Sequence, residues 1–365
     1  MPLVPVPRTE LQRVESHTPS SRFESVGVEV PVRSLTTADL LRSMKHKMGL
    51  DLERLTGIRA RRVCAPGESS YTLAIGAARD CLKHSRYRPE DLEVIINCSI
   101  SRSKDGKTIV YEPSMAHYIR QAIGASNAMV FDVNNACAGM LTGVEILNGY
   151  IRNGTFKNGM VVSGEHITPI SDSAARTVRT IASRQLASLT VGDAGAAVII
   201  EKAGESEKGM SVTQFTTLSK FCKLCIGKPL MTDVGGMMVA KARKIHRVAL
   251  DHAPDLMKGA LVKAGLTIDK IDHLIPHQTS KSSIKKGVKE IAERFKATPR
   301  NVVINLKEYG NTASTTVFLA LHDMLRDKVV KRGENVMLLC FASGLVVGVV
   351  IFTMDDLVDR YASSN

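Results

Sequence analysis

The segment VFDVNNACAGMLTGVEIL, residues 130–147, contains the clearest structural signal in the sequence. It begins with an apolar run that is typical of a buried strand and stops at Asp132. Small and apolar residues then recur at roughly helical spacing, and Cys137 stands between the two patterns. The order predicts a strand followed at once by a buried helix, with a thiol at the first turn of that helix.

The composition indicates an α/β protein. The chain has 365 residues, of which 44% are hydrophobic and 4% aromatic, with 27 glycines and no tryptophan. That balance favours packing through small residues in a large core. Apolar runs are strand-length and stay well below the ~20 residues of a membrane span. Residues 1–21 carry prolines and charges in place of a signal peptide's apolar stretch. We expect a cytoplasmic protein with a flexible N-terminal arm over residues 1–21.

Charge and cysteines limit the classes of ligand. The formal net charge of +13 fits a solvated basic surface, and it also fits an acidic protein partner, a phosphorylated ligand such as coenzyme A, or nucleic acid. No nucleic-acid motif supports the last, so no nucleic-acid or membrane partner is expected. The seven cysteines are odd in number and mostly lie in apolar runs, which argues against a disulfide framework. Cys222 and Cys225 form one C-x-x-C, which is weak evidence for zinc, and no metal site is predicted.

The two halves of the chain repeat one arrangement. Strand-like runs alternate with helical stretches at 91–100, 128–133, 159–165 and 195–202. Three later segments match the first three in pattern and order: 270–280, 301–321 and 335–344. We interpret this as an internal duplication, with an N-terminal half over 22–202 and a C-terminal half over 203–365. The alternation predicts a mostly parallel sheet in each half, with helices on its faces.

Matched strand ends would bring reactive residues together. Ligand sites of open α/β sheets lie at the carboxyl ends of strands, and Cys137, His277, Asn311 and the Ser343–Gly344 turn all follow strand-like runs. Free N–H groups at a helix start favour a thiolate, so we expect a lowered pKa for Cys137. The set suggests thioester chemistry, in which Cys137 attacks an acyl thioester and His277 and Asn311 hold an enolate oxygen. The N–H groups of Cys137 and Gly344 could form an oxyanion hole for the acyl carbonyl.

Five motifs resemble the 3-oxoacyl-ACP synthase III branch of the thiolase superfamily over about residues 22 to 353: TGIRARRV, DVNNACAG, VGDAGAAVII, IPHQ and YGNTAS. The resemblance implies a five-layered αβαβα fold of two duplicated halves, a homodimer, and carbon–carbon bond formation by Claisen condensation. It implies no cofactor beyond the acyl-CoA or acyl-ACP phosphopantetheine thioesters that serve as substrates. It also implies that Cys137 is the acylated nucleophile and that His277 and Asn311 are oxyanion donors.

The chain departs from that family before the TGIR segment. Ordinary members bind the coenzyme A adenine there with a Trp and an Arg, and this chain has Asp51 and Leu55 at those places, with Arg54 nearby. An acyl carrier protein is the natural alternative donor, and such proteins are acidic. Lysines on one predicted helix face, together with Arg54, are candidates for docking a carrier protein or coenzyme A: Lys281, Lys285 and Lys289. A solvated basic helix explains the lysines equally well.

Glu112, in YEPSMAHYIRQAIG, resembles a residue of head-to-head condensing enzymes that form olefins, pyrones or dialkylresorcinols. There the Glu comes from the partner subunit and removes an α-proton from the second acyl chain. A malonyl donor makes its enolate by losing carbon dioxide, whereas an unactivated acyl donor needs such a base.

The sequence therefore predicts an acyltransferase of the β-ketoacyl synthase type, in secondary-lipid or polyketide-like biosynthesis. It would condense two acyl thioesters without decarboxylation. Three alternatives stay open. They are a decarboxylative synthase that uses malonyl-ACP, an acyltransferase to an oxygen or nitrogen acceptor, and a non-catalytic subunit with the same fold.

Overall fold

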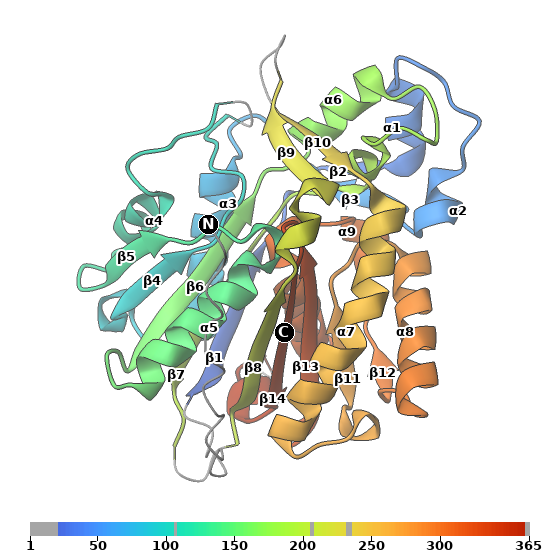
Figure 1. Ribbon diagram of the computed structural model, residues 1–365. Coiled ribbons are helices and arrows are strands. Elements are labelled where there is room, and N and C mark those ends of the chain that lie inside the picture. The colour runs from blue at the N-terminus through green and yellow to red at the C-terminus, as the bar shows by residue number, and fades with distance from the viewer. Residues whose placement is uncertain (1–20, 106–107, 205–207, 231–235, 362–365) are drawn as a thin grey trace, which may run out of the picture.

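Two five-stranded sheets with one shared strand order form the centre of the protein (Figure 1). The computed structural model describes residues 21–105, 108–204, 208–230 and 236–361. The N-terminal sheet has the order β1-β7-β6-β4-β5, and the C-terminal sheet has the order β8-β14-β13-β11-β12. Because the strands correspond one to one between the halves, the topology supports the predicted internal duplication.

The strands of the N-terminal sheet are β1 (Ser21–Glu29), β4 (Val94–Asn97), β5 (Met129–Asp132), β6 (Asn158–Glu165) and β7 (Ala194–Lys202). Those of the C-terminal sheet are β8 (Met210–Thr217), β11 (His273–Pro276), β12 (Asn301–Val302), β13 (Asn335–Ala342) and β14 (Val346–Thr353).

Helices separate and cover the two sheets. The α-helices are α1 (Thr37–Ser43), α2 (Leu52–Thr56), α3 (Ser70–Lys83), α4 (Met115–Ile123), α5 (Gly139–Arg152), α6 (Pro169–Thr177), α7 (Ala242–Ala264), α8 (Lys281–Phe295), α9 (Leu306–Tyr309) and α10 (Thr316–Arg326). Short 3-10 helices are η1 (Pro89–Asp91), η2 (Ala136–Ala138), η3 (Leu186–Thr190), η4 (Ser219–Leu224), η5 (Ile268–Lys270), η6 (Ala313–Thr315) and η7 (Asp356–Tyr361). Two small sheets pair β2 (Ser34–Thr36) with β3 (Ala60–Arg62) and β9 (Cys225–Pro229) with β10 (Gly236–Ala240).

The layers follow from the alternation of side chains along each strand. Val94 and Ile96 of β4 pack inward with α5 and α10, whereas Ile95 between them packs outward with α3 and α4. In the C-terminal sheet, Leu338 faces the inner helices and Met337 faces α7. The order of layers is therefore helix, sheet, helix pair, sheet, helix, which confirms the predicted five-layered αβαβα fold.

The prediction of mostly parallel sheets is wrong for half of the pairings. β4 pairs in parallel with β5 and β6, but β6 with β7 and β7 with β1 are antiparallel, and the second sheet repeats this mixture. The reason is visible between β13 and β14, where only residues 343–345 connect the strands. A connection that short can join only antiparallel neighbours.

The sequence also predicted an N-terminal arm and a boundary between the two halves. Of the predicted arm over 1–21, only Ser21 lies among the described residues, where it begins β1. The predicted boundary after residue 202 falls where β7 ends, and β8 begins at Met210. Within the described part of the chain, no helix has both the length and the apolar character that crossing a bilayer requires.

Candidate active site

Cys137 lies in η2, the short turn between the end of β5 and the start of α5. Ala136 before it adopts a left-handed conformation with φ of 47°, which turns the chain sharply. The Cys137 carbonyl accepts a hydrogen bond from the Cys340 thiol of β13 at 3.0 Å. This hydrogen bond holds the turn of the first half against the central strand of the second half. The Cys137 side chain is half-buried.

The predicted lowering of the Cys137 pKa is wrong. Burial, with smaller contributions from the neighbouring Cys225 and Glu165, raises the pKa of this thiol to about 12. The helix proper begins only at Gly139, after a 3-10 turn, so the favourable N–H field near the sulfur is smaller than the cost of desolvating a thiolate. The resting residue is therefore a neutral thiol, which must lose its proton as it attacks.

His277 follows β11 directly and faces the same region. Its N–H donates to Leu339 O at 2.7 Å, in continuation of the parallel pairing of β11 with β13. This register places His277 beside Cys340, the residue that holds the Cys137 carbonyl. Burial lowers the pKa of His277 to about 4, and the imidazole is consequently neutral at pH 7. Its Nδ1 lies 2.7 Å from the Thr316 hydroxyl at the start of α10.

Asn311 is held from two sides in the loop before η6. Its N–H donates to Thr190 O at 2.9 Å, and Gly192 N–H donates to Asn311 O at 3.0 Å. The side-chain oxygen accepts from Ala313 N–H at 3.0 Å. Because that oxygen is engaged, the side-chain amide NH₂ is the part of Asn311 suited to donate to a ligand. The turn η6 contacts η2, so the segments that carry Cys137, His277 and Asn311 meet at one end of the two sheets.

The turn with Ser343 and Gly344 connects β13 to β14 beside this region. Gly344 has a φ of 130°, a conformation that glycine adopts without strain. The Ser343 side chain hydrogen-bonds the Cys225 thiol, and Cys225 acts electrostatically on Cys137. Cys225 is thus a residue of the candidate site, a role that its C-x-x-C motif with Cys222 does not indicate.

Glu165, a buried acidic residue, connects segments around the site by hydrogen bonds. The sequence did not predict this role. The Glu165 oxygens accept hydrogen bonds from the Ile100 and Ser101 N–H groups and from the hydroxyl of Ser314, the last at 2.5 Å. Burial raises the pKa of Glu165, and these donors oppose the rise. Because Ser314 belongs to the second half, the network ties η6 to the end of β6. The only sequence signal was a charged residue at the end of a strand-like apolar run, GMVVSGE.

No hydrogen bond or ion pair among the described residues links Glu112 to Cys137. Glu112 is exposed in the segment before α4, next to exposed Tyr111. The predicted docking residues do lie near one another. Arg54 is exposed on α2, which contacts α8, and Ser282 of α8 hydrogen-bonds Leu55 O at 3.2 Å. The lysines of α8 are exposed as predicted for one face: Lys281, Lys285 and Lys289.

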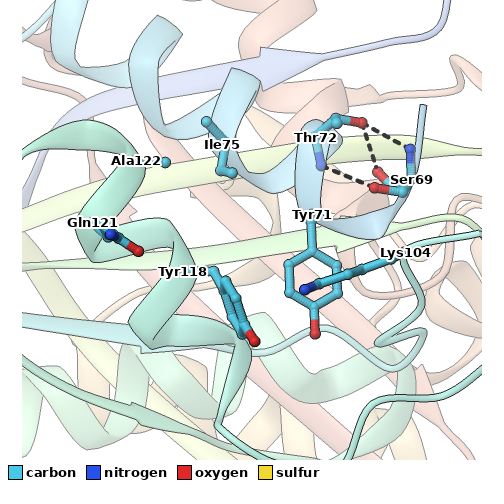
Figure 2. A pocket seen from close by; sticks show the side chains of 8 residues that line it. All are labelled: Ser69, Tyr71, Thr72, Ile75, Lys104, Tyr118, Gln121 and Ala122. Atoms are coloured by element: carbon cyan, nitrogen blue, oxygen red, sulfur yellow. Dashed lines mark hydrogen bonds between the residues drawn. The ribbon is translucent and has the colours of Figure 1, made fainter. Parts of the chain in front are cut away.

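A separate pocket of about 440 Å³ lies on the outer side of the N-terminal sheet, between α3 and α4 (Figure 2). Tyr71, Tyr118 and Lys104 converge there, with Lys104 Nζ 4.2 Å from the centroid of the Tyr118 ring. None of the reactive residues above lines it, so this pocket is not where the site chemistry would occur.

Comparisons with known proteins agree with the geometry. Residues 131–219 match the family "3-Oxoacyl-[acyl-carrier-protein (ACP)] synthase III", and residues 261–354 match its C-terminal domain family. The β-ketoacyl-[acyl-carrier-protein] synthase III of Clostridium novyi is 28% identical over 337 residues, which are 90% of this chain and 97% of that protein. Synthase III 2 of Halalkalibacterium halodurans is 29% identical and covers 89% of this chain and 94% of its own.

Solved structures share the fold. The 3-oxoacyl-[acyl-carrier-protein] synthase III of Aquifex aeolicus superposes with a TM-score of 0.77 at 24% identity, covering 91% of this chain and 99% of its own. OleA of Xanthomonas campestris, solved with bound lauric acid and lauroyl-CoA, superposes with a TM-score of 0.80 at 21% identity. That match covers 92% of this chain and 100% of OleA.

Proposed function

Because the chain belongs to the 3-oxoacyl-[acyl-carrier-protein] synthase III family, we propose that it joins two acyl thioesters by Claisen condensation without decarboxylation. The first acyl group is carried on Cys137, and Glu112 of a second copy of the chain is the base. The observation that carries this proposal is the meeting of η2, η6 and the end of β11, where a neutral thiol lies among neutral donors.

In the first step, Cys137 Sγ attacks the thioester carbonyl carbon. A carbon–sulfur bond forms to Cys137, the bond to the donor's phosphopantetheine sulfur breaks, and the thiol proton leaves with the departing thiol. The pKa of Cys137, raised to about 12, means that proton loss accompanies the attack. Backbone N–H groups of Cys137 and Gly344 would stabilise the oxyanion that forms on the acyl carbonyl.

In the second step, His277 and Asn311 would hold the oxygen of the incoming thioester as it becomes an enolate. The single proton of the Thr316 hydroxyl has two acceptors, His277 Nδ1 at 2.7 Å and Ala313 O at 3.2 Å. In the proposed tautomer the Thr316 hydroxyl donates to Nδ1, so the ring proton lies on Nε2, from which it can be donated to an enolate oxygen. Thr316 is thereby a positioning residue for His277.

Glu112 would form that enolate by accepting the α-proton of the second acyl chain. The enolate carbon then attacks the acyl carbon on Cys137, so a carbon–carbon bond forms and the bond to Cys137 breaks; the departing thiolate takes up a proton from solvent, and Glu112 releases the α-proton to solvent. The exposed position of Glu112 leaves it accessible to a second copy of the chain. We therefore propose a cytoplasmic homodimer that lacks activity as separated monomers.

An acyl carrier protein is the proposed donor of at least one chain. Arg54 and the exposed lysines of α8 form a basic surface that suits an acidic partner. The absence of Trp from the sequence removes the ring that stacks coenzyme A adenine in ordinary members. The product would enter secondary-lipid or polyketide-like biosynthesis.

Intact-protein mass spectrometry with acyl-CoA and acyl-ACP donors tests the proposal. Cys137→Ala should give no acyl-enzyme, whereas Glu112→Gln should be acylated and give no condensed product. Glu90→Gln, at an exposed position outside the site, is the matched control and should behave as the wild type. Normal condensation by Glu112→Gln would exclude the carboxylate base.

A decarboxylative synthase that uses malonyl-ACP is the second candidate, favoured by the names of the matching relatives. Carbon dioxide release from malonyl-ACP in step with product, retained in Glu112→Gln, would select it. Transfer of the acyl group to an oxygen or nitrogen acceptor would instead give a product without a new carbon–carbon bond, which product mass distinguishes.

A further inference from the structure

Three metal-ligating side chains meet at a junction of the two halves. Asp80 is near the end of α3, His84 follows that helix directly, and His322 is on α10. Tyr361 of η7 packs against both imidazoles, stacked on His84 with 4.3 Å between ring centroids and edge-on to His322 at 5.7 Å, and the two imidazoles are themselves 6.5 Å apart. The N-terminal half, the C-terminal half and the end of the described chain therefore converge on this cluster.

The distances suit a small cation better than direct hydrogen bonds. One ligand atom from each of Asp80, His84 and His322 lies within 4.8 Å of the other two. His322 Nε2 is 3.7 Å from Asp80 Oδ2, which is too long for a hydrogen bond. Tetrahedral zinc with bonds of about 2.0–2.1 Å separates its ligand atoms by roughly 3.4 Å. The His322–Asp80 pair would close by a few tenths of an ångström around such an ion, and the widest pair by up to roughly 1.4 Å, which side-chain rotation of the half-buried His84 can supply.

The surrounding contacts orient the groups as ligands. His84 Nδ1 is 3.3 Å from Arg360 O, so its N–H donates there and Nε2 keeps a lone pair. Asp80 Oδ2 accepts from Val28 N–H at 3.0 Å, which fixes the carboxylate and leaves it further lone pairs. The Nε2 of His322 faces Asp80, whereas its buried Nδ1 has no hydrogen-bond partner among the described residues, so the ring of His322 is held by packing alone. A histidine whose other nitrogen is bound to a backbone carbonyl is the usual arrangement around zinc.

A second cluster, Cys64, His166 and Asp193, fits an ion less well. Both Asp193 oxygens already accept hydrogen bonds, from the N–H groups of Ile167 and Thr168, the Thr168 hydroxyl and the Cys64 N–H. Ligation there would displace donors from a fully buried carboxylate.

We propose that Asp80, His84 and His322 bind one divalent transition-metal ion such as Zn²⁺, with water as a fourth ligand. This differs from the sequence prediction of no metal, which could not foresee that α3 and α10 bring distant residues together. The ion would tie α3 to α10. His322 is six residues from Thr316, about 9 Å along the helix axis, so the site would also fix the helix that positions His277.

Equilibrium dialysis of the full-length, chelator-treated protein against Zn²⁺ tests the site, and the visible spectrum after Co²⁺ loading reports the ligand type. Asp80→Asn, His84→Gln and His322→Gln should each weaken Zn²⁺ binding by ~10-fold or more. His117→Gln, an exposed histidine, and Cys64→Ser are controls that should keep wild-type affinity. The Co²⁺ spectrum should lack a thiolate charge-transfer band, and the Tm of the wild type should rise with Zn²⁺ concentration.

His84→Gln is the decisive variant because His84 is only half-buried and the variant is expected to fold. Because the variant also loses the stacking on Tyr361, the comparison is the rise in Tm on adding Zn²⁺ to each metal-free protein, which should be much smaller in His84→Gln than in the wild type. Undiminished Zn²⁺ affinity in His84→Gln, a thiolate band that disappears in Cys64→Ser, or failure of the wild type to bind one equivalent of Zn²⁺ would each overturn the proposal.

Discussion

Stability between pH 7.5 and pH 5.0 should depend on His277. Burial lowers the pKa of His277 from 6.5 to about 4. In the unfolded chain the imidazole takes up its proton near pH 6.5, whereas the folded protein takes it up only near pH 4. The stabilisation is therefore complete above pH 6.5 and is lost as the pH falls toward 4. With 1.36 kcal/mol for each unit, the loss between pH 7.5 and 5.0 is about 2 kcal/mol.

Replacement of His277 by Gln removes the titrating group and keeps an amide that can bond Thr316. Other groups also titrate between pH 7.5 and 5.0. The fall in unfolding free energy over this range is therefore measured for both proteins, and the two falls are compared. Wild type should lose about 2 kcal/mol more than His277→Gln. Urea unfolding at pH 7.5 and 5.0, at one fixed protein concentration, measures it.

His117→Gln is the matched control for this experiment, since His117 is exposed on α4 and should leave the pH dependence of the wild type unchanged. A difference below about 0.5 kcal/mol between wild type and His277→Gln would contradict the reasoning, because it would mean that the folded imidazole is solvated. A solvated, protonatable His277 would also remove the neutral donor that the proposed enolate step uses.

The remaining predictions concern the thiols, two glycines and the docking surface. Alkylation of Cys137 by iodoacetamide, followed by peptide mass spectrometry, should still accelerate above pH 9.5; a plateau near pH 8.5 would signal an ordinary thiol. Cys225→Phe should slow acylation by long-chain donors more than by acetyl-CoA, and equal slowing would place the ring away from the acyl path. Gly164→Ala should cost about 3 kcal/mol in urea unfolding, since its Cβ would lie 2.0 Å from the α3 backbone, whereas Gly149→Ala, in open space on α5, should stabilise by about 0.5–1 kcal/mol. Lys285→Glu should raise KM for acyl-ACP roughly fivefold to tenfold at low salt while KM for acyl-CoA stays constant; equal changes for both donors would argue against a carrier-protein surface.

The sequence predicted the strands that carry the site because their apolar runs end at residues with special chemistry. The runs around β4, β5, β6 and β11 are continuous and bounded by polar residues, so their positions could be read directly. β1, over Ser21–Glu29, escaped notice because Arg22 and Glu24 interrupt its apolar pattern. Both charges are buried in the structure, and they are tolerated because Arg22 pairs with Glu201 at 2.7 Å while Glu24 pairs with Arg360 at 3.0 Å.

The effect of burial on the pKa of a site residue could not be predicted from the sequence, because burial depends on segments that are distant in the chain. The thiol of Cys137 was expected to be acidic from its place at a helix start, yet the desolvation set by distant segments raises its pKa. The interaction with Cys225 depends on how β9 folds over the site, and local pattern carries no information about that. For the same reason Glu165 and its partner Ser314, 149 residues away in sequence, could not be paired in advance.

The same left-handed backbone turn occurs in both duplicated halves and has a different role in each. Ala136 and Ala313 both adopt left-handed conformations, with φ of 47° and 55°, at equivalent turns before α5 and α10. In the first half this turn presents Cys137, which contacts Cys340 of β13. In the second it presents Ser314, which contacts Ser163 of β6 at 2.7 Å.

The first turn therefore carries the reactive sulfur. The second turn has a structural role, because its Ser314 hydroxyl hydrogen-bonds Ser163 and the buried Glu165. A carboxylate beside a thiol disfavours its thiolate, and Glu165 does act on Cys137 in that direction. Its bonds to Ser314 and backbone N–H groups hold the carboxylate's oxygens in place. In the proposed condensation such a sulfur stays protonated until a thioester reaches it, and the asymmetric use of two equivalent turns supplies that property.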